Sequence, residues 1–281
     1  MLWLDGRLTQ GPVPFDLVDR GLTLGDGVFD TALALNGRIA FGEAHRARLA
    51  ASAAALGFAL DPDRIGQAMD ALAGAAGEGP VAIRTTATRG SGPRGLKPPP
   101  EPRPTLFASA AAMGPGLFFA PLRLRPTRIA RNETSPGSQL KTLGYLDAVL
   151  AAGEAAAHGF DEALFLNTRG RVACAGTGNL FALFGGRLVT PPLADGVLAG
   201  IVRAELLRLA PGLGLVPEER SLTLPELMGA DSVFLTNSLR LVAPVAAIGE
   251  RAFASAGHPA FADLREALRR RIAAECGGAS P

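Results

Sequence analysis

Only two of the 28 Lys and Arg residues in this 281-residue chain are lysines, Lys97 and Lys141. A lysine can lose its proton and attack a carbonyl group, which an arginine cannot do. Lys97 is followed by three prolines, a context typical of an exposed loop. Lys141 stands at the start of an apolar segment, for which we expect a helix over residues 142–158. Burial favours the neutral amine, so Lys141 is either the nucleophile of a Schiff-base site or a surface lysine with a buried stem.

A glycine-rich stretch at residues 90–95, GSGPRG, has the spacing G-x-G-x-x-G. A dinucleotide-binding loop of that spacing must open a helix, and Pro93 with the prolines at 98–100 prevents one here. The stretch is therefore either a plain turn or an anion-contacting loop, flanked by Arg89 and Arg94.

A further arginine, Arg48, lies in the segment HRARL at residues 45–49. We expect a helix over residues 43–56, with Leu49 on its inner face. Arg48 is then either a solvated helix residue or a phosphate ligand that reaches inward with its planar guanidinium.

Charge and cysteine content exclude several classes of protein. The 28 basic and 26 acidic residues give a net charge of +2, which gives no electrostatic case for nucleic acid or an anionic membrane as partner. Cys174 and Cys276 are too few for a disulfide scaffold or a four-cysteine zinc site, and they fit a reducing cytoplasm. We expect no signal peptide, because Asp5 and Arg7 interrupt the N-terminal apolar residues. The uncharged stretch 105–122 contains a Gly-Pro-Gly break and is expected to form two strands instead of a membrane span.

Motifs of hydrolases and nucleotide-binding proteins are also missing from the sequence. It contains no H-E-x-x-H, C-x-x-C, G-x-S-x-G or Walker-type motif, and its three histidines are far apart. These observations leave metal-dependent hydrolysis and serine hydrolysis without support, and no metal site is expected.

Periodicity and turn residues predict a mixture of strands and helices. Asn36-Gly37 favours a type I′ hairpin between residues 29–35 and 38–41. Asp61-Pro62 favours the start of a helix that extends to about residue 76. Further helices are expected over 197–209 and 259–276, and further strands over 81–88, 117–124, 127–131, 162–166, 171–173, 179–184, 187–189 and 232–236. Unequal blocks of this kind favour the α+β class. The Gly114-Pro115-Gly116 segment is the best candidate for a boundary between a domain over 1–113 and one over 114–281.

These motifs, taken together and in order, resemble those of the class IV pyridoxal-phosphate (PLP) enzymes. The family includes branched-chain aminotransferases, D-amino-acid aminotransferases and 4-amino-4-deoxychorismate lyases. The resemblance spans nearly the whole chain. It rests on residues 19–31 (DRGLTLGDGVFDT), His45-x-x-Arg48-Leu49, residues 89–95, Lys141 with the segment after it, residues 161–164, 176–181 and 196–203, and residues 236–245.

The resemblance implies a two-domain α+β fold of fold type IV, D-amino-acid aminotransferase-like, with a smaller N-terminal domain and a larger C-terminal domain with a β-barrel-like core. It also implies a homodimer with the cofactor PLP between the domains and an amino-acid-like small-molecule substrate. Lys141 would be catalytic and form the Schiff base with PLP. The cofactor phosphate would be held by Arg48, by the backbone N–H groups of Ile201 and Val202, and by Ser238 with its neighbour Asn237. Phosphate binding at a helix N-terminus agrees with the general chemistry of such ends.

The same resemblance suggests where the substrate binds. Phe29 would line the substrate side of the cofactor ring, with Thr31 two residues further along the strand. Arg94 would be a candidate for binding a substrate carboxylate.

One position departs from the family pattern. Alignment on residues 179–181 puts Cys174 where the family has a glutamate that bonds the pyridine nitrogen of PLP. A carboxylate keeps that nitrogen protonated and strengthens the ring as an electron sink, whereas a neutral thiol cannot. Aminotransfer should suffer most from this replacement.

Residues 89–95 and 140–150 are most similar to the corresponding segments of the lyases. Those enzymes release 4-aminobenzoate and pyruvate and serve folate biosynthesis. The alternatives are an aminotransferase of the D-amino-acid or branched-chain type and a catalytically weakened PLP-binding homologue. In the lyase reaction, Lys141 would also carry the proton removed from the substrate.

Overall fold

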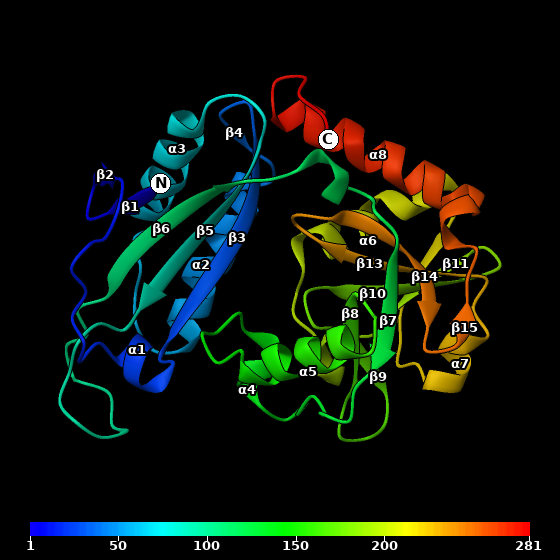
Figure 1. Cartoon of the computed structure of the whole chain (residues 1–281), viewed down its shortest axis with the longest axis horizontal. Helices are drawn as coiled ribbons and strands as arrows, with labels where there is room; N and C mark the ends of the chain where they lie inside the picture. The colour runs from blue at the N-terminus through cyan, green and yellow to red at the C-terminus, as the bar shows by residue number, and fades with distance from the viewer. The chain divides into compact units, whose positions relative to one another are not determined.

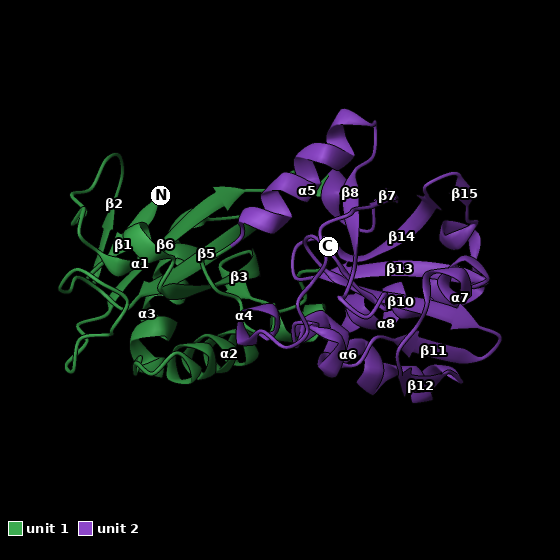
Figure 2. Ribbon diagram, turned by 90° about the horizontal axis from the view of Figure 1, so that it is seen from below, with its two compact units in different colours: residues 1–115, 140–144, 272–281 green, residues 116–139, 145–271 purple.

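The computed structural model describes all 281 residues and divides into two compact units. Unit 1 comprises Met1–Pro115, Leu140–Gly144 and Ile272–Pro281, and unit 2 comprises Gly116–Gln139 and Tyr145–Arg271 (Figures 1 and 2). The first change of unit falls within the Gly114-Pro115-Gly116 segment. Two later segments return to unit 1, and one of them contains Lys141.

Unit 1 is an antiparallel sheet with two helices on one face. Its six strands have the order β2-β1-β6-β5-β3-β4. Helices α2 and α3 pack on the sheet through a core that includes Val28, Leu49 and Ile65 (Figure 1). The elements are β1 (Leu2–Leu4), β2 (Arg7–Thr9), α1 (Arg20–Leu24), β3 (Gly27–Leu35), β4 (Arg38–Ile39), α2 (Gly42–Ala55), α3 (Pro62–Ala76), β5 (Pro80–Thr88) and β6 (Thr105–Ala112).

Short sequence motifs account for the turns and the helix start in unit 1. Asn36 and Gly37 both have positive φ, 48° and 78°, which confirms the predicted tight turn between β3 and β4. Helix α3 begins after Asp61, whose carboxylate accepts a hydrogen bond from the N–H of Asp63 at 2.9 Å. Residues 90–104 form the predicted long connection, which joins β5 to β6.

Unit 2 contains a closed six-stranded barrel of strands β10, β13, β14, β7, β8 and β9, with the pairing of β9 and β10 closing the ring. Strands β11 and β12 extend the sheet beyond β10, and β15 pairs with β14. The strands are β7 (Leu122–Pro126), β8 (Glu162–Leu166), β9 (Val172–Ala175), β10 (Asn179–Phe184), β11 (Arg187–Thr190), β12 (Val216–Glu219), β13 (Ser232–Asn237), β14 (Leu241–Ile248) and β15 (Arg251–Ala252).

The helices that follow unit 1's last strand are mostly short. They are α4 (Pro136–Gln139), α5 (Leu146–Ala157), α6 (Ile201–Leu209), α7 (Leu224–Met228) and α8 (Pro259–Glu275), with 3₁₀ turns η1 (Pro115–Leu117), η2 (Leu193–Asp195), η3 (Ala210–Leu213) and η4 (Ser255–Gly257). The last residues of α8, from Ile272 on, belong to unit 1. None of the helices combines the length and the apolar character needed to cross a membrane.

Four predicted elements differ from the structure. The expected strands over 117–124 and 127–131 are replaced by η1, the strand β7 and a single bridge at Arg131. The expected helix over 142–158 begins only at Leu146, because residues before it pair with β3. The expected helix over 197–209 begins at Ile201, after Gly200 in an extended conformation.

Candidate functional site

Lys141 lies in an extended segment that adds to the edge of β3. Phe29 donates its N–H to the carbonyl of Lys141 at 2.8 Å, and Leu143 donates to the carbonyl of Gly27 at 3.0 Å. Val28 and Thr142 form the antiparallel bridge between these bonds, so Lys141 lies opposite Phe29. Residues opposite each other in antiparallel strands share a face. The Lys141 ammonium nitrogen accordingly lies 4.2 Å from the centre of the Phe29 ring.

A second cation, which the sequence analysis missed, lies over the same ring. Arg84 of β5 is opposite Thr31 of β3, and its guanidinium carbon is 3.5 Å from the centre of the Phe29 ring. Phe29 is buried, whereas Arg84 is exposed. The alternation of β3 places Thr31 on the same face as Phe29. Predicting Arg84 would have required the register of β3 and β5, which the sequence alone does not give.

Arg48 contacts the opposite side of β3. Asp30 points away from Phe29 by strand alternation, and it accepts hydrogen bonds from Arg48 Nε at 2.8 Å and Nη2 at 2.9 Å. His45 Nδ1 lies 2.6 Å from Oδ1 of Asp30, the oxygen that also accepts from Arg48 Nη2. Burial would raise the pKa of Asp30, but His45 and Arg48 outweigh burial and hold the pKa well below its usual value. Two of the Arg48 nitrogens are thus committed to an ionised aspartate.

The glycine-rich loop brings Arg94 to the surface. Arg94 is exposed, and its guanidinium makes no hydrogen bond or ion pair. Arg89 is different: it is buried, and it bonds Asp26 at 2.8 Å together with the carbonyls of Leu56 and Gly57. Of the two arginines that flank the loop, only Arg94 is therefore available to contact an anion.

The predicted residues of unit 2 gather at one end of the barrel. Asn179, the first residue of β10, lies opposite both Cys174 of β9 and Thr236 of β13. Its side-chain amide donates to the carbonyl of Leu198 at 2.8 Å, which fixes the segment leading into α6. Cys174, the start of α6 and the turn after Thr236 are thus all positioned by one residue.

The start of α6 has the features of an anion site. Gly200 is its N-cap and has no side chain to accept hydrogen bonds from Ile201 and Val202, so these N–H groups are open to an external acceptor. A Cβ on Gly200 would lie 2.0 Å from the amide oxygen of Asn179, so only glycine permits this close packing. The residues present therefore fit the phosphate of PLP.

The neighbouring turn carries Ser238. Asn237 pairs with Leu241 across a tight connection, and its amide oxygen accepts the N–H groups of Leu239 at 3.0 Å and Arg240 at 2.7 Å. Its amide nitrogen lies 3.4 Å from the Thr177 hydroxyl. Asn237 therefore shapes the turn, and Ser238 is the residue that the turn presents.

Cys174 is paired with an arginine. It lies opposite Phe165 of β8, and the guanidinium of Arg131 lies 4.8 Å from the centre of the Phe165 ring. The positive charge of Arg131 also acts on the Cys174 sulfur. Burial raises the pKa of the Cys174 thiol, and Arg131 only partly opposes this. A protonated thiol has an S–H to donate to an acceptor.

Two other residues near this pair were missed by the sequence analysis. Tyr145, the only tyrosine in the chain, is the N-cap of α5 and interacts electrostatically with Arg131. Glu162 is buried, accepts from the Thr177 hydroxyl at 2.5 Å and disfavours ionisation of Cys174. Glu162 belongs to the family segment 161–164, but its partner Thr177 lies in the connection between β9 and β10, which the sequence alone does not bring next to it.

No three His, Cys, Asp or Glu side chains of the chain are grouped so that they could hold a metal ion. The polar groups instead suit organic anions: two cations over Phe29, an exposed arginine on a loop, and open N–H groups at a helix start. A lysine amine such as that of Lys141 can attack the carbonyl of an anionic molecule.

Comparison with known proteins gives consistent matches. The sequence profile of the family described as amino-transferase class IV matches residues 27–248. A protein of Methanocaldococcus jannaschii, named provisionally as a branched-chain-amino-acid aminotransferase, is 32% identical over 265 residues, covering 89% of this chain and 88% of that protein. The structure of 4-amino-4-deoxychorismate lyase from Pseudomonas aeruginosa has a TM-score of 0.85 and 33% identity, covering 96% of this chain and 98% of that one. Branched-chain aminotransferase from Thermoproteus uzoniensis has a TM-score of 0.88 and 27% identity, covering 99% and 96%.

Proposed function

The chain belongs to the class IV amino-transferase family and is a PLP-dependent enzyme, and from that premise we propose that it cleaves 4-amino-4-deoxychorismate to 4-aminobenzoate and pyruvate. The observation that supports this proposal is the buried Cys174 thiol, with Arg131 acting on it, at the position where alignment on residues 179–181 puts the family's glutamate. A thiol cannot keep the pyridine nitrogen protonated, so carbanion stabilisation is weaker and elimination is favoured over aminotransfer. The similarity to the Pseudomonas aeruginosa lyase supports the same reaction.

Bound PLP would supply an aldehyde that condenses with an amine and withdraws electrons from the adjacent carbon. The Lys141 amine would form the covalent attachment and, once displaced by the substrate amine, would take the proton from the substrate α-carbon. We assign the phosphate to the N–H groups of Ile201 and Val202, with Ser238, Asn237 and Arg48 as further contributors.

The substrate should carry carboxylate groups. Arg84 and Lys141 concentrate positive charge over Phe29, and Arg94 offers an uncommitted guanidinium. Phe29 and Thr31, on one face of β3, would form the wall against which the substrate lies. An amino-acid-like molecule with more than one carboxylate meets these requirements better than a branched-chain amino acid.

We also propose a homodimer. Helix α5 exposes Leu146, Val149 and Leu150, which lie along one side of the helix at spacings of three and four residues. In unit 1, Leu17, Val18 and Leu22 are exposed around α1. Apolar side chains gathered in this way are typical of surfaces covered by a partner. Sedimentation or light scattering of purified protein should give twice the chain mass, and a monomer would contradict this.

Aminotransfer is the second candidate, because the Methanocaldococcus jannaschii relative carries that name. One pair of assays separates the candidates. Purified protein loaded with PLP should release 4-aminobenzoate from aminodeoxychorismate and should exchange amino groups between amino and keto acids much more slowly. If amino-group exchange is the faster reaction, the lyase proposal is wrong. If the protein catalyses neither reaction, the chain is the catalytically weakened homologue.

Lys141→Ala is the variant that tests the covalent attachment. It should lose the visible absorption of bound PLP and all turnover, because no other amine is placed to replace it. Lys97→Ala is the matched control, since Lys97 is the chain's other lysine and is exposed in a loop. An unchanged spectrum in Lys141→Ala would show that the assignment is wrong.

A further inference from the structure

The loop Gly90–Pro104 is held at its two ends by one residue. Asp19 Oδ2 accepts a hydrogen bond from the hydroxyl of Thr88 at 2.7 Å, at the end of β5, and from that of Thr105 at 3.2 Å, at the start of β6. The loop ends also touch, since a Cβ on Gly90 would lie 1.9 Å from the carbonyl oxygen of Arg103. Gly90 has a φ of +85°, which glycine alone adopts easily.

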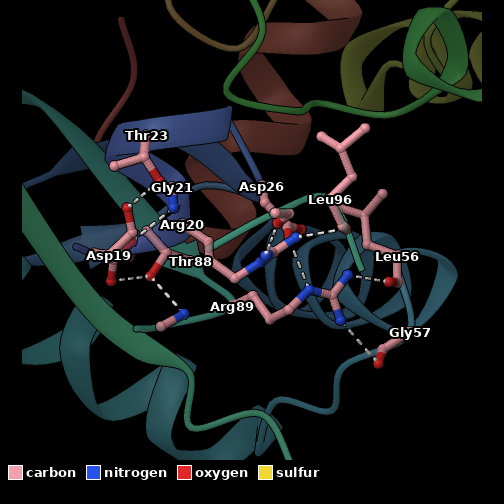
Figure 3. A network of polar contacts seen from close by, with 12 residues as sticks. Asp19, Arg20, Gly21, Thr23, Asp26, Leu56, Gly57, Thr88, Arg89 and Leu96 are labelled. Carbon is pink, nitrogen blue, oxygen red and sulfur yellow. Dashed lines mark hydrogen bonds and ion pairs between the residues drawn. The ribbon is translucent and has the colours of Figure 1, made fainter. Parts of the chain in front are cut away.

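The next residue along the chain, Arg20, holds the far part of the loop. Its Nη1 and Nη2 each donate a hydrogen bond at 3.0 Å, to the carbonyls of Gly95 and Leu96 respectively. Its Nε donates to Asp26 at 2.8 Å, and the Arg20 side chain is 4% exposed (Figure 3). The two bonded carbonyls belong to the residues that directly follow Arg94. A buried guanidinium thus fixes the backbone next to an exposed one.

Asp26 holds a second arginine in the same way. Arg89 donates from Nε to the same carboxylate oxygen at 2.8 Å, but its other nitrogens bond the carbonyls of Leu56 and Gly57 after α2 (Figure 3). Hydrogen bonds from Arg89 and Arg20 outweigh burial and lower the pKa of Asp26, so it stays ionised. The two arginines share one anchor and differ in what they hold.

We propose that Arg20 is a positioning residue for substrate recognition, which orders the loop so that Arg94 is presented to a substrate carboxylate. The proposal rests on the assigned role of Arg94 and extends it to a buried residue that does not contact substrate.

 Three glycines lie within residues 90–95, at positions 90, 92 and 95, so the loop has much backbone freedom to lose. Fixing the loop before the substrate arrives lowers the entropy cost of binding.

A lysine at position 20 cannot replace this arrangement. Arg20 uses three nitrogens at once, one on Asp26 and two on neighbouring carbonyls, and only the planar guanidinium offers them in a fixed geometry. A lysine ammonium keeps the charge next to Asp26 but cannot span both carbonyls. Arg20→Lys is therefore the variant that removes the grip on the loop and keeps the buried ion pair.

Trypsin reports on the order of the loop without any assay of activity. Lys97 and Arg103 are each followed by proline, which blocks trypsin, so the bond after Arg94 is the susceptible one in the exposed part of the loop. In PLP-loaded full-length protein, Arg20→Lys should be cut after Arg94 about tenfold faster than the unsubstituted chain, because the loop opens more often. Mass spectrometry identifies the fragments 1–94 and 95–281.

Arg89→Lys is the matched control. It alters the same anchor, Asp26, but its carbonyl partners lie outside the loop. It should leave cleavage after Arg94 within about twofold of the unsubstituted rate. A Gly92→Ala variant disturbs the same contact through a residue of the loop. Its Cβ would lie 3.3 Å from Arg20 Cδ, a tight contact, so cleavage after Arg94 should be slightly faster. If trypsin cuts Arg20→Lys no faster than the unsubstituted chain, or cuts Arg89→Lys as fast as Arg20→Lys, Arg20 does not order the loop and the proposal is wrong.

Kinetics then test recognition. Arg20→Lys should raise KM for the carboxylate-bearing substrate about tenfold and leave kcat and PLP content unchanged, the pattern of lost substrate binding. In an Arg94→Ala background, Arg20→Lys should raise KM no further, because its effect passes through Arg94. Additive effects would show that Arg20 acts structurally and would overturn the proposal. If Arg94→Ala leaves KM unchanged, the role of Arg94 fails, and proteolysis still decides whether Arg20 orders the loop.

Discussion

Two arginines, one in each unit, act on buried side chains of different chemistry. In unit 1, Arg48 and His45 surround Asp30, a carboxylate that is 3% exposed and ionised. In unit 2, the charge of Arg131 favours the thiolate of Cys174, but burial outweighs Arg131 and raises the pKa of the thiol. The first pair neutralises the charge of Arg48 and fixes α2 against β3. The second leaves the charge of Arg131 uncompensated by its partner.

We therefore expect the first arginine to serve mainly the stability of the fold and the second to influence the chemistry of the site. A carboxylate next to an arginine gains ionisation, and breaking such a pair leaves an isolated buried charge. A thiol next to an arginine gains little and can still donate its S–H. In a PLP enzyme, the second arrangement would lower the tendency of the pyridine nitrogen to hold a proton, because a positive charge lies nearby.

The largest expected effect comes from breaking the carboxylate pair. Asp30→Asn removes the negative charge that Arg48 and His45 share, so the free energy of unfolding should fall by about 3–5 kcal/mol. Chemical denaturation measures this loss. Asp70→Asn is the control, because Asp70 of α3 is exposed and lies 4.0 Å from Arg46 of α2, and it should cost less than about 1 kcal/mol. Equal losses in both variants would contradict the structural role of Asp30.

The next effect tests whether Arg48 also serves the cofactor. Arg48→Ala should weaken PLP binding by roughly 2–5 kcal/mol if one member of a buried charge pair with the phosphate is lost. Equilibrium dialysis of folded apoprotein with PLP gives the dissociation constant. Arg46→Ala, two residues earlier on α2 and more exposed, should leave it unchanged. An unaltered constant in Arg48→Ala would confine Arg48 to its contact with Asp30.

Turns and helix starts show which parts of the fold the sequence could predict. Asn36-Gly37 and Asp61-Pro62 act on their immediate neighbours, and the structure confirms the turn and the helix start that they predict. The helix after Lys141 was predicted too early, because the groups of Lys141 and Leu143 that would have begun it bond with β3, far away in the sequence.

The residues of the candidate site likewise fall into those that local motifs predict and those that depend on contacts between distant segments. Family motifs pointed to Lys141, Cys174 and Ser238, and the roles assigned to them remain predictions. The sequence analysis did not find Arg131 or Arg84, because each acts through a partner on another strand. Local composition carries no information on that register.

A smaller effect should follow from making the two pairs alike. Cys174→Glu puts a carboxylate next to Arg131 and should raise conversion of bound PLP to its amine form by amino acids, on the order of tenfold, or about 1.4 kcal/mol in the barrier. The absorption spectrum follows this conversion. Cys174→Gln is the control, since it is similar in size but carries no charge. A Glu variant that retains PLP and shows no gain would show that Cys174 does not limit aminotransfer.

The smallest effect concerns alkaline pH and the thiol itself. Burial raises the pKa of Cys174 in the folded protein, so the unfolded chain loses this proton first as pH rises. The stability that the neutral thiol contributes is complete below the unfolded pKa of about 8.5 and declines above it, with a slope of at most about 1.4 kcal/mol per pH unit. Denaturation between pH 7 and pH 10 should therefore show a steeper decline for the unsubstituted chain than for Cys174→Ala. Asp30 stays ionised throughout this range and adds nothing to the slope, because its pKa is lowered. Identical slopes in the two proteins would mean that Cys174 ionises as readily folded as unfolded, and the contrast between the two arginine pairs would then be lost.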